Sequence, residues 1–252
     1  MAMAAQGTRM PGADLYPPLD CLKPVADTVW IVDGPAIRFG PWPLRMRFPT
    51  RAALIRTPAG LFVHSPTRLT PSLRAEIEAI GPPRWIIGPN RIHYWWIPDW
   101  HRAWPDAEIW LAPGIEAQAK GRIDFPTSPL DRDAGYPWDA QIATLPIAGA
   151  YMTEIDFFHR ASRTLILTDF IENFEPAKLG FWTRWLTRLG GALDPNGSMP
   201  RDMRLAYPRA TLKAAVETMI AWDPDRIILA HGRWHERDGT AELKRAFRWL
   251  LD

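Results

Sequence analysis

Cysteine is almost absent from this chain, which has one, Cys21, among 252 residues. A lone cysteine excludes an intramolecular disulfide and favours a reducing setting, so we expect a cytoplasmic protein. No stretch reaches the roughly 18 consecutive apolar residues that indicate a membrane span. Residues 1–12 also lack the apolar centre that is typical of a signal peptide.

The chain also lacks an excess of either charge, since 30 lysines and arginines stand against 28 aspartates and glutamates. This balance gives no reason to expect nucleic acid or an anionic membrane as the main partner. A small-molecule substrate or ligand is the partner that we expect instead.

Tryptophan and proline are abundant, with 14 and 26 residues, and 47% of the chain is hydrophobic. The length and apolar content suit one large domain with a sizeable core. We expect a loosely ordered N-terminal segment over residues 1–18 and a single domain over 19–252. Residues 172–208 interrupt the domain with an apolar helix and a stretch rich in glycine and proline, and we interpret them as an insertion.

Strand patterns come first as hairpins and then alternate with helices in each half of the chain. The predicted strands are Thr28–Val32, 39–49, Arg51–Arg56, Leu61–His64, Trp85–Ile87, Glu108–Ala112, Ile142–Ile147, Glu154–His159, Thr164–Thr168 and Arg226–Ala230. The predicted helices are Ser72–Ile80, Gly114–Lys120, Phe181–Leu189, Leu212–Trp222 and Thr240–Leu251, and a further helix is expected to begin after Pro98-Asp99 in the aromatic stretch 94–104. Residues 121–137 form a polar connection long enough to lie over a site. This order favours an α+β sandwich with helices outside over an open parallel sheet.

Polar side chains follow three of the predicted strands. His93 lies shortly after the first of these strands, Asp169 directly after the second, and His231 directly after the third. A strand that ends in this way places the side chain in the loop layer at the sheet edge, where binding and catalytic groups gather. The three residues are therefore candidates for one site.

The segments around these residues resemble the metallo-β-lactamase superfamily over roughly residues 27–251. The resemblance rests on His64-Ser65-Pro66, Gly88-Pro89-Asn90, Glu154, Thr164–Asp169 (TLILTD) and Ile227–Gly232 (IILAHG). These segments look most like a divergent branch, DUF4336, in which Pro-Asn replaces the first histidine of the metal motif. The resemblance implies a four-layer αββα sandwich and a hydrolysis that uses one or two zinc or iron ions.

The metal motif of that superfamily is only partly present. The resemblance assigns Asp169 to the aspartate that bridges two metals and His231 to the last histidine ligand. With Asn90 in the place of the first histidine, none of the next three ligand positions holds a side chain suited to a metal. His93 fits only if the loop slips by one residue, and Ala150 stands where a further histidine is expected.

Ligand number then limits the chemistry. Two metal ions need about five or six ligands and a bridging aspartate, which this chain does not offer. His93, Asp169 and His231 suffice for one ion, because two imidazoles and a carboxylate with an open position match a catalytic zinc or non-haem iron site. We therefore expect one zinc or iron ion, or none.

The remaining site residues are assigned by role. Asp169 or Glu154 would accept the proton of the attacking water, and Glu154, four residues beyond Ala150, is also a candidate to take the place of the missing histidine in space. Arg91 and Arg233 would steady an anionic substrate. Trp95 belongs to an aromatic stretch that would line a substrate pocket.

Each candidate also has a purely structural interpretation. Asp169 suits the start of the next segment as a cap, and His231 suits a hydrogen bond to a loop carbonyl. His93 suits packing among neighbouring aromatic side chains. Asn90 suits an Asx turn, and Glu154 suits a salt bridge to an arginine.

Three functions follow as hypotheses. The leading one is a metal-dependent hydrolase with at most one metal, acting on an ester, a lactone or a phosphate ester. The second is a non-catalytic relative that binds a ligand or a protein partner through its aromatic cleft. The third concerns the apolar stripe of residues 181–189, which by default packs across the sandwich but otherwise forms a homodimer contact or touches a membrane surface.

Overall fold

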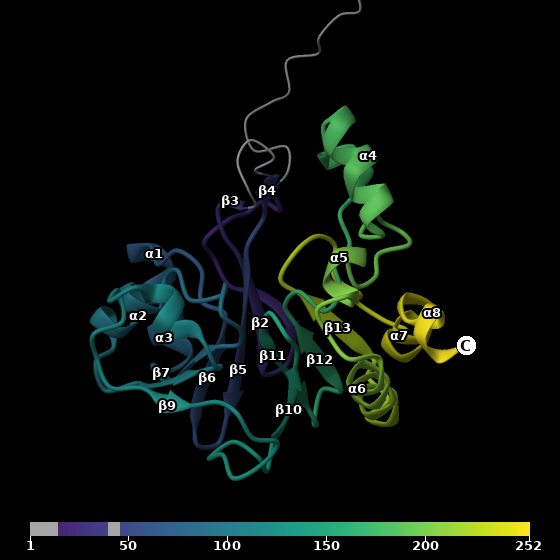
Figure 1. The fold of residues 1–252 in the computed structure, drawn as a ribbon. Coiled ribbons are helices and arrows are strands. Elements are labelled where there is room, and N and C mark those ends of the chain that lie inside the picture. Colours follow the sequence, from purple (N-terminus) through teal and green to yellow (C-terminus); the bar gives the residue numbers. More distant parts are fainter. Residues whose placement is uncertain (1–14, 40–45) are drawn as a thin grey trace, which may run out of the picture.

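The computed structural model describes residues 15–39 and 46–252, and its arrangement is drawn in Figure 1. The expectation of loose order over residues 1–18 falls mainly on residues 1–14, which lie outside the described residues. Of the residues 15–18 that are described, the Leu15 carbonyl accepts a hydrogen bond from Lys178 Nζ at 2.7 Å. Leu44, part of the predicted strand 39–49, also lies outside them.

Two sheets form the centre of the domain (Figure 1). The larger has the order β1-β2-β5-β6-β7-β8-β9, and the smaller has the order β10-β11-β12-β13. The strands of the larger sheet are β1 (Lys23–Ala26), β2 (Val29–Asp33), β5 (Arg51–Thr57), β6 (Gly60–His64), β7 (Pro83–Gly88), β8 (Glu108–Leu111) and β9 (Ser128–Pro129). Those of the smaller sheet are β10 (Ile142–Ala148), β11 (Thr153–His159), β12 (Thr164–Leu167) and β13 (Arg226–Leu229). A separate hairpin pairs β3 (Ile37–Phe39) with β4 (Met46–Phe48).

Helices cover the outer face of each sheet (Figure 1). The helices on the larger sheet are α1 (Pro71–Ile80), α2 (Ile97–Ala103) and α3 (Ile115–Ala119), and those on the smaller sheet are α6 (Arg209–Ala221), α7 (Gly239–Ala246) and α8 (Arg248–Leu251). Residues 172–208 add η1 (Pro176–Lys178), α4 (Phe181–Gly190) and α5 (Arg201–Arg204). The fold is therefore the α+β, four-layer αββα sandwich that the sequence predicts. No helix among the described residues combines the length and apolarity needed to cross a membrane.

Alternating side chains bind the layers together. Along β11, Ile155 and Phe157 enter the core between the sheets, whereas Phe158 faces the outer core under α6 to α8. Large aromatic side chains fill the inner core, where Phe62 and Trp85 each meet Trp138 edge-on at 5.1 Å and 5.6 Å between ring centroids. Such edge-to-face pairs add to the free energy gained from burying apolar area. Much of the tryptophan that the composition reveals thus stabilises the core.

Several predicted elements differ from the structure. Strands β1 and β9 and helix α5 were not predicted, because each is four residues long or shorter and carries no clear periodicity. The closing helix breaks at Phe247, whose backbone leaves the helical region while its ring packs against Phe170 at 5.1 Å. Residues 121–137 do not cover the site, since Phe125 and Tyr136 pack on the core of the larger sheet instead.

Candidate metal centre

Two of the candidate ligands are brought together by strand register. Strands β12 and β13 are parallel neighbours, and Leu167 pairs with Leu229 at their ends. Asp169 and His231 each follow two residues later, so they leave the same edge of the sheet at the same height. Their positions in the loop layer are thus a consequence of the pairing that the apolar strands impose.

The third ligand comes from the other sheet. The loop after β7 crosses toward β11, where the Pro89 carbonyl accepts a hydrogen bond from the Ile155 amide at 2.9 Å. The loop then turns sharply, with the His93 amide donating to the Asn90 carbonyl at 3.1 Å. This turn aims His93 at the other two side chains, which settles the register that sequence reasoning left open.

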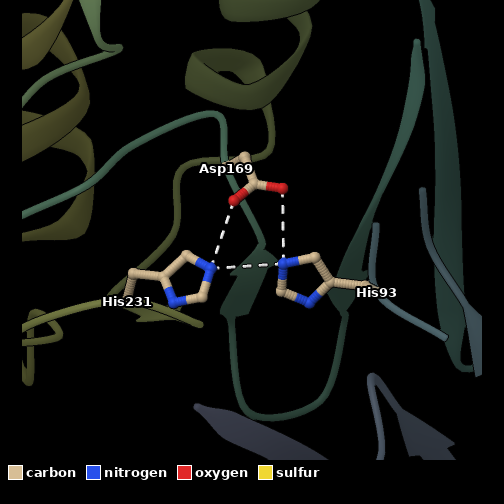
Figure 2. Close-up of side chains that lie close together, drawn as sticks. All are labelled: His93, Asp169 and His231. Atoms are coloured by element: carbon tan, nitrogen blue, oxygen red, sulfur yellow. Dashed lines mark hydrogen bonds and ion pairs between the residues drawn. The ribbon is translucent and has the colours of Figure 1, made fainter. Parts of the chain in front are cut away.

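His93, Asp169 and His231 converge on one point, as Figure 2 shows. The Nε2 atom of His93 lies 3.3 Å from one carboxylate oxygen of Asp169, and the Nε2 atom of His231 lies 3.2 Å from the other. The two Nε2 atoms are 3.2 Å apart. That separation is close to the roughly 3.3 Å between two ligands of a tetrahedral zinc ion with bonds of about 2.0 Å.

The far nitrogen of each imidazole is fixed by a hydrogen bond. The Ser65 hydroxyl lies 2.7 Å from His93 Nδ1, and the Pro49 carbonyl lies 2.7 Å from His231 Nδ1. A carbonyl oxygen only accepts, so His231 Nδ1 carries a proton and presents Nε2 to the site. Metal-binding histidines are held in this way, because the second hydrogen bond sets both the tautomer and the ring orientation.

The Asp169 carboxylate is also held from behind. The Asn90 amide nitrogen donates to it at 2.7 Å, while the Asn90 side-chain oxygen accepts from the Ile92 amide at 3.0 Å. Asn90 therefore makes the predicted Asx turn and orients a ligand at the same time. One oxygen of Glu154 accepts hydrogen bonds from three consecutive backbone amides, those of Thr168, Asp169 and Phe170, each at 3.0 Å.

A buried arginine secures the His231 loop. Arg51 Nη1 donates to the carbonyls of Leu229 and Gly232, at 2.6 Å and 2.9 Å, and its Nη2 lies 2.7 Å from the Asp33 carboxylate. Gly232 has a φ of +88°, and a Cβ there would lie 2.2 Å from the Asn173 carbonyl oxygen. The residue after His231 must therefore be glycine, since any side chain would clash with the backbone.

Electrostatics favour a negative Asp169 between two imidazoles. Burial alone would raise the pKa of Asp169, but the neighbouring His93 and His231 outweigh it and hold that pKa below its ordinary value. Burial likewise acts to lower the pKa of His231, and the hydrogen bond and charge of Asp169 outweigh it and raise that pKa. A divalent cation would displace the proton that His93 or His231 shares with the Asp169 carboxylate, so the three side chains are chemically suited to hold one.

The three residues lie in the wall of a cavity of about 590 Å³. Most of its lining is apolar and comes from the β3–β4 hairpin and from residues 172–208. The lining side chains include Ile37, Met46, Phe48, Ile92, Phe174, Leu186, Leu189 and Met203, with the polar Glu172, Thr187, Arg201 and Asp202 among them. The cavity is thus walled largely by residues 172–208 and not by the tryptophan-rich stretch that is expected to form an aromatic cleft.

The predicted supporting residues lie elsewhere. Glu154 is fully buried and does not line the cavity, and no arginine within residues 15–39 and 46–252 forms a salt bridge with it. Arg91 contacts the Tyr151 carbonyl and ring, and the exposed Arg233 lies 3.9 Å from Asp194. Neither arginine lines the cavity.

Trp95 lies on the other side of His93. It is 38% exposed and lines a minor pocket of about 20 Å³ that His93 and His231 also border. Two later tryptophans of the same aromatic stretch, Trp100 and Trp104, are buried in the core. Trp95 is therefore near the metal centre but outside the main cavity.

Sequence reasoning missed four residues of this site. Ser65 and Arg51 hold the histidines and their loop, and Glu172 and Arg201 are charged groups in the cavity wall. Burial raises the pKa of Glu172 to about 8. Only the pair of Ser65 with His64 carried a signal, since the resemblance rested partly on it, and the other three have no local pattern that marks them.

A comparison with protein families identifies the chain. Residues 27–179, more than half of the sequence, match a domain of unknown function, DUF4336. The chain belongs to the DUF4336 family. A comparison with curated protein sequences finds no match.

Solved structures place this DUF4336 chain among metallo-β-lactamase folds. The DIM-1 metallo-β-lactamase aligns with a TM-score of 0.62 at 10% identity, over 94% of this chain and 97% of that one. The FIM-1 metallo-β-lactamase from Pseudomonas aeruginosa in its mono-zinc form gives 0.57 at 11% identity, over 92% and 96%. The metal-soaked Flv1 flavodiiron core from Synechocystis sp. PCC6803 gives 0.61 at 12% identity, over 94% and 61%. At such identities the likeness shows the fold alone, so this DUF4336 chain has the metallo-β-lactamase fold.

Proposed function

We propose that this protein is a metal-dependent hydrolase that uses one zinc or iron ion held by His93, Asp169 and His231. The observation that carries the proposal is the convergence of two imidazole nitrogens and a carboxylate, all within 4.8 Å of one another, on the wall of a cavity. Two imidazoles and a carboxylate leave a coordination position open, which is the mark of a catalytic rather than a structural site.

Support for a single ion comes from the number of ligands. Among the described residues, no second group of three or more metal-binding side chains lies close together. Glu154, the candidate to take the place of the missing histidine, has one oxygen engaged by three amides and does not join the group. The fold relative FIM-1 has been crystallised with one zinc, so the fold accommodates this stoichiometry.

A bound zinc or iron ion supplies Lewis acidity, which polarises a carbonyl or phosphoryl oxygen and lowers the pKa of water toward about 7. The protein's own groups complete the site. Glu172 is a cavity carboxyl beside the ligands and is placed to transfer a proton to a leaving group. Arg201 in the same wall is placed to attract an anionic part of the substrate. Esters, lactones and phosphate esters all fit this arrangement.

The direct test is metal-dependent turnover. Untagged protein, reconstituted with one equivalent of zinc or iron(II), is assayed on chromogenic carboxylic esters, lactones and phosphate esters. We expect His231→Ala to lower kcat/KM by on the order of 100-fold or more, since a Lewis acid contributes several kcal/mol. The matched control is His101→Ala, because His101 stacks on Phe125 at 4.0 Å outside the cavity and does not approach the ligands.

Glu172→Gln separates binding from chemistry. It should lower kcat by roughly 100-fold or more while the metal content stays at the wild-type level. Activity that survives both a chelator and His231→Ala would contradict the proposal. A protein that binds no metal at all would instead favour the non-catalytic relative that binds a ligand in its cavity.

A further inference from the structure

Helix α4 exposes an apolar surface that a folded domain ordinarily buries. Phe181 is 65% exposed, Trp182 78%, Trp185 51%, Leu186 49% and Leu189 60%. These five residues fall on one side of the helix and are called the α4 face below. In Figure 1 the helix projects from the sandwich beside the β3–β4 hairpin. Large exposed apolar patches mark binding surfaces.

Helix α4 turns its apolar side outward and a polar side toward the domain, which is the reverse of the usual arrangement. Thr187 is the helix residue that is buried against the domain, and its hydroxyl bonds to the Thr183 carbonyl at 2.8 Å. The default prediction, with the apolar stripe packed across the sandwich, is therefore wrong. A surface helix normally turns its apolar stripe inward, so the α4 face is built to contact something outside the described residues.

The charge around the α4 face points to the kind of partner. Arg184 and Arg188 flank it, and both are exposed. Helix α4 contains these two arginines and no aspartate or glutamate, and the nearest carboxylates in sequence, Glu175 and Asp194, lie outside the helix. The whole chain is nearly neutral, but this segment is locally basic. Tryptophan, phenylalanine and leucine on one face with arginines at the edge is the composition of helices that lie in a lipid interface.

We propose that the α4 face docks on an anionic lipid surface. The helix has 10 residues, half of the roughly 20 needed to span a bilayer, so it would lie in the plane of the interface. A second copy of the chain fits less well as the partner. A twofold contact between two α4 helices would bring Arg184 and Arg188 of one copy close to the same arginines of the other, and the helix has no carboxylate to pair with them. Anionic headgroups complement those two arginines.

The α4 face also continues into the cavity. Leu186 and Leu189 belong both to the exposed face and to the cavity wall that holds His93, Asp169 and His231. Docking through α4 would therefore set the cavity mouth against the lipid. An apolar molecule dissolved in the lipid would reach the cavity along these two leucines without crossing water.

The test is binding to vesicles by co-sedimentation. Purified full-length protein is mixed with vesicles of phosphatidylcholine alone and with vesicles that contain about 30% phosphatidylserine. We expect binding to the anionic vesicles that weakens as salt rises. Replacing Trp182 and Trp185 together by alanine should lower the vesicle affinity about tenfold or more per tryptophan, because each loses a large buried apolar area.

The arginines and the controls complete the design. Replacing Arg184 and Arg188 by glutamine should lower the affinity for anionic vesicles by about 30-fold, since each basic residue near such a surface contributes roughly fivefold. Tyr151→Ala, which removes an aromatic side chain that is 49% exposed outside α4, should bind as wild type does. Unchanged thermal stability of the variants shows that the fold is intact.

Two results would overturn the proposal. One is no binding to anionic vesicles, or binding that the tryptophan pair does not affect. The other is a dimer by light scattering that the tryptophan pair converts to monomer without any vesicle binding, which makes a second copy the occupant. The assay reads binding alone and is run with and without a chelator. A protein that docks but binds no metal refutes only the hydrolase, and one that binds metal but does not dock refutes only this inference.

Discussion

The hydrogen bond between Ser65 and His93 gives a sharp test of how the site is organised. Ser65→Ala removes the partner of His93 Nδ1, which lies 2.7 Å away, and leaves all three ligands in place. Loss of such an outer hydrogen bond typically lowers metal affinity 10–100-fold. That range corresponds to about 1.4–2.7 kcal/mol of binding free energy. The ring of His93 would then turn more freely, and binding would have to restore its orientation.

The chain offers a close control for this variant. Ser162 lies 2.7 Å from Nδ1 of His159, a buried histidine outside the metal centre. Ser162→Ala therefore deletes the same kind of bond at a place where no metal binds. Ser65→Ala should lose about 1 kcal/mol of unfolding free energy, the usual net value of one hydrogen bond, and Ser162→Ala should lose about 2 kcal/mol, because the Ser162 hydroxyl also lies 2.8 Å from that of Thr164. Only Ser65→Ala should lose metal affinity.

The assay is a competition titration with a chromophoric zinc chelator at pH 7, paired with urea unfolding of the metal-free proteins. The reasoning predicts wild-type affinity for Ser162→Ala and an affinity 10–100-fold weaker for Ser65→Ala. Equal zinc affinity in all three proteins, with the expected loss of stability in both variants, would refute the view that Ser65 positions a ligand.

Three further predictions concern stability and are checked by urea unfolding. Arg51→Met leaves the carbonyls of Leu229 and Gly232 without their donor and leaves the buried Asp33 carboxylate with Lys23 alone, so it should lower the free energy of unfolding by about 3 kcal/mol; a loss below 1 kcal/mol would contradict the role of Arg51 in securing the His231 loop. Burial lowers the pKa of His64 to about 3. Between pH 6.5 and 3, His64 therefore binds a proton in the unfolded chain but not in the folded protein. The free energy of unfolding falls as the pH drops through this range, and at pH 5 the loss is about 2 kcal/mol. His64→Leu should remove that part of the loss between pH 7 and pH 5, and an unchanged loss would show that His64 is not its source. Gly232→Ala should lower the free energy of unfolding clearly more than Gly121→Ala does. Both glycines have positive φ, but only at Gly232 would the added Cβ lie within 4 Å of backbone atoms. Equal losses in the two variants would show that the clash at Gly232 does not affect stability.

The layers and the strand ends of the fold were predictable because they follow from local patterns. The apolar runs before Asp169 and His231 fixed two strands, and parallel pairing of those strands then fixed the two side chains at one edge. The Asx turn at Asn90 was predictable from residue type. His93 was predictable as a candidate but not in its direction, because that depends on the hydrogen bond between Pro89 and Ile155 across the two sheets.

The cavity was not predictable, since its wall comes from segments distant in sequence. Ile37 and Met46 of the β3–β4 hairpin meet Leu186 and Met203 of the insertion there, and no periodicity relates them. The outward turn of α4 was missed for a different reason. A helical pattern shows that one face is apolar but does not show which face meets the protein, and here Thr187 is the residue that packs inward.

The proposed chemistry depends on one metal ion held by His93, Asp169 and His231. Elemental analysis of untagged protein, purified without chelators, measures this most directly for wild type, Asp169→Ala and the control Asp139→Ala, whose carboxylate caps a turn outside the cavity. We expect about one equivalent of zinc or iron per chain in the wild type and the control, and almost none in Asp169→Ala. Little metal in all three proteins, or a full equivalent that survives the loss of Asp169, would contradict this expectation.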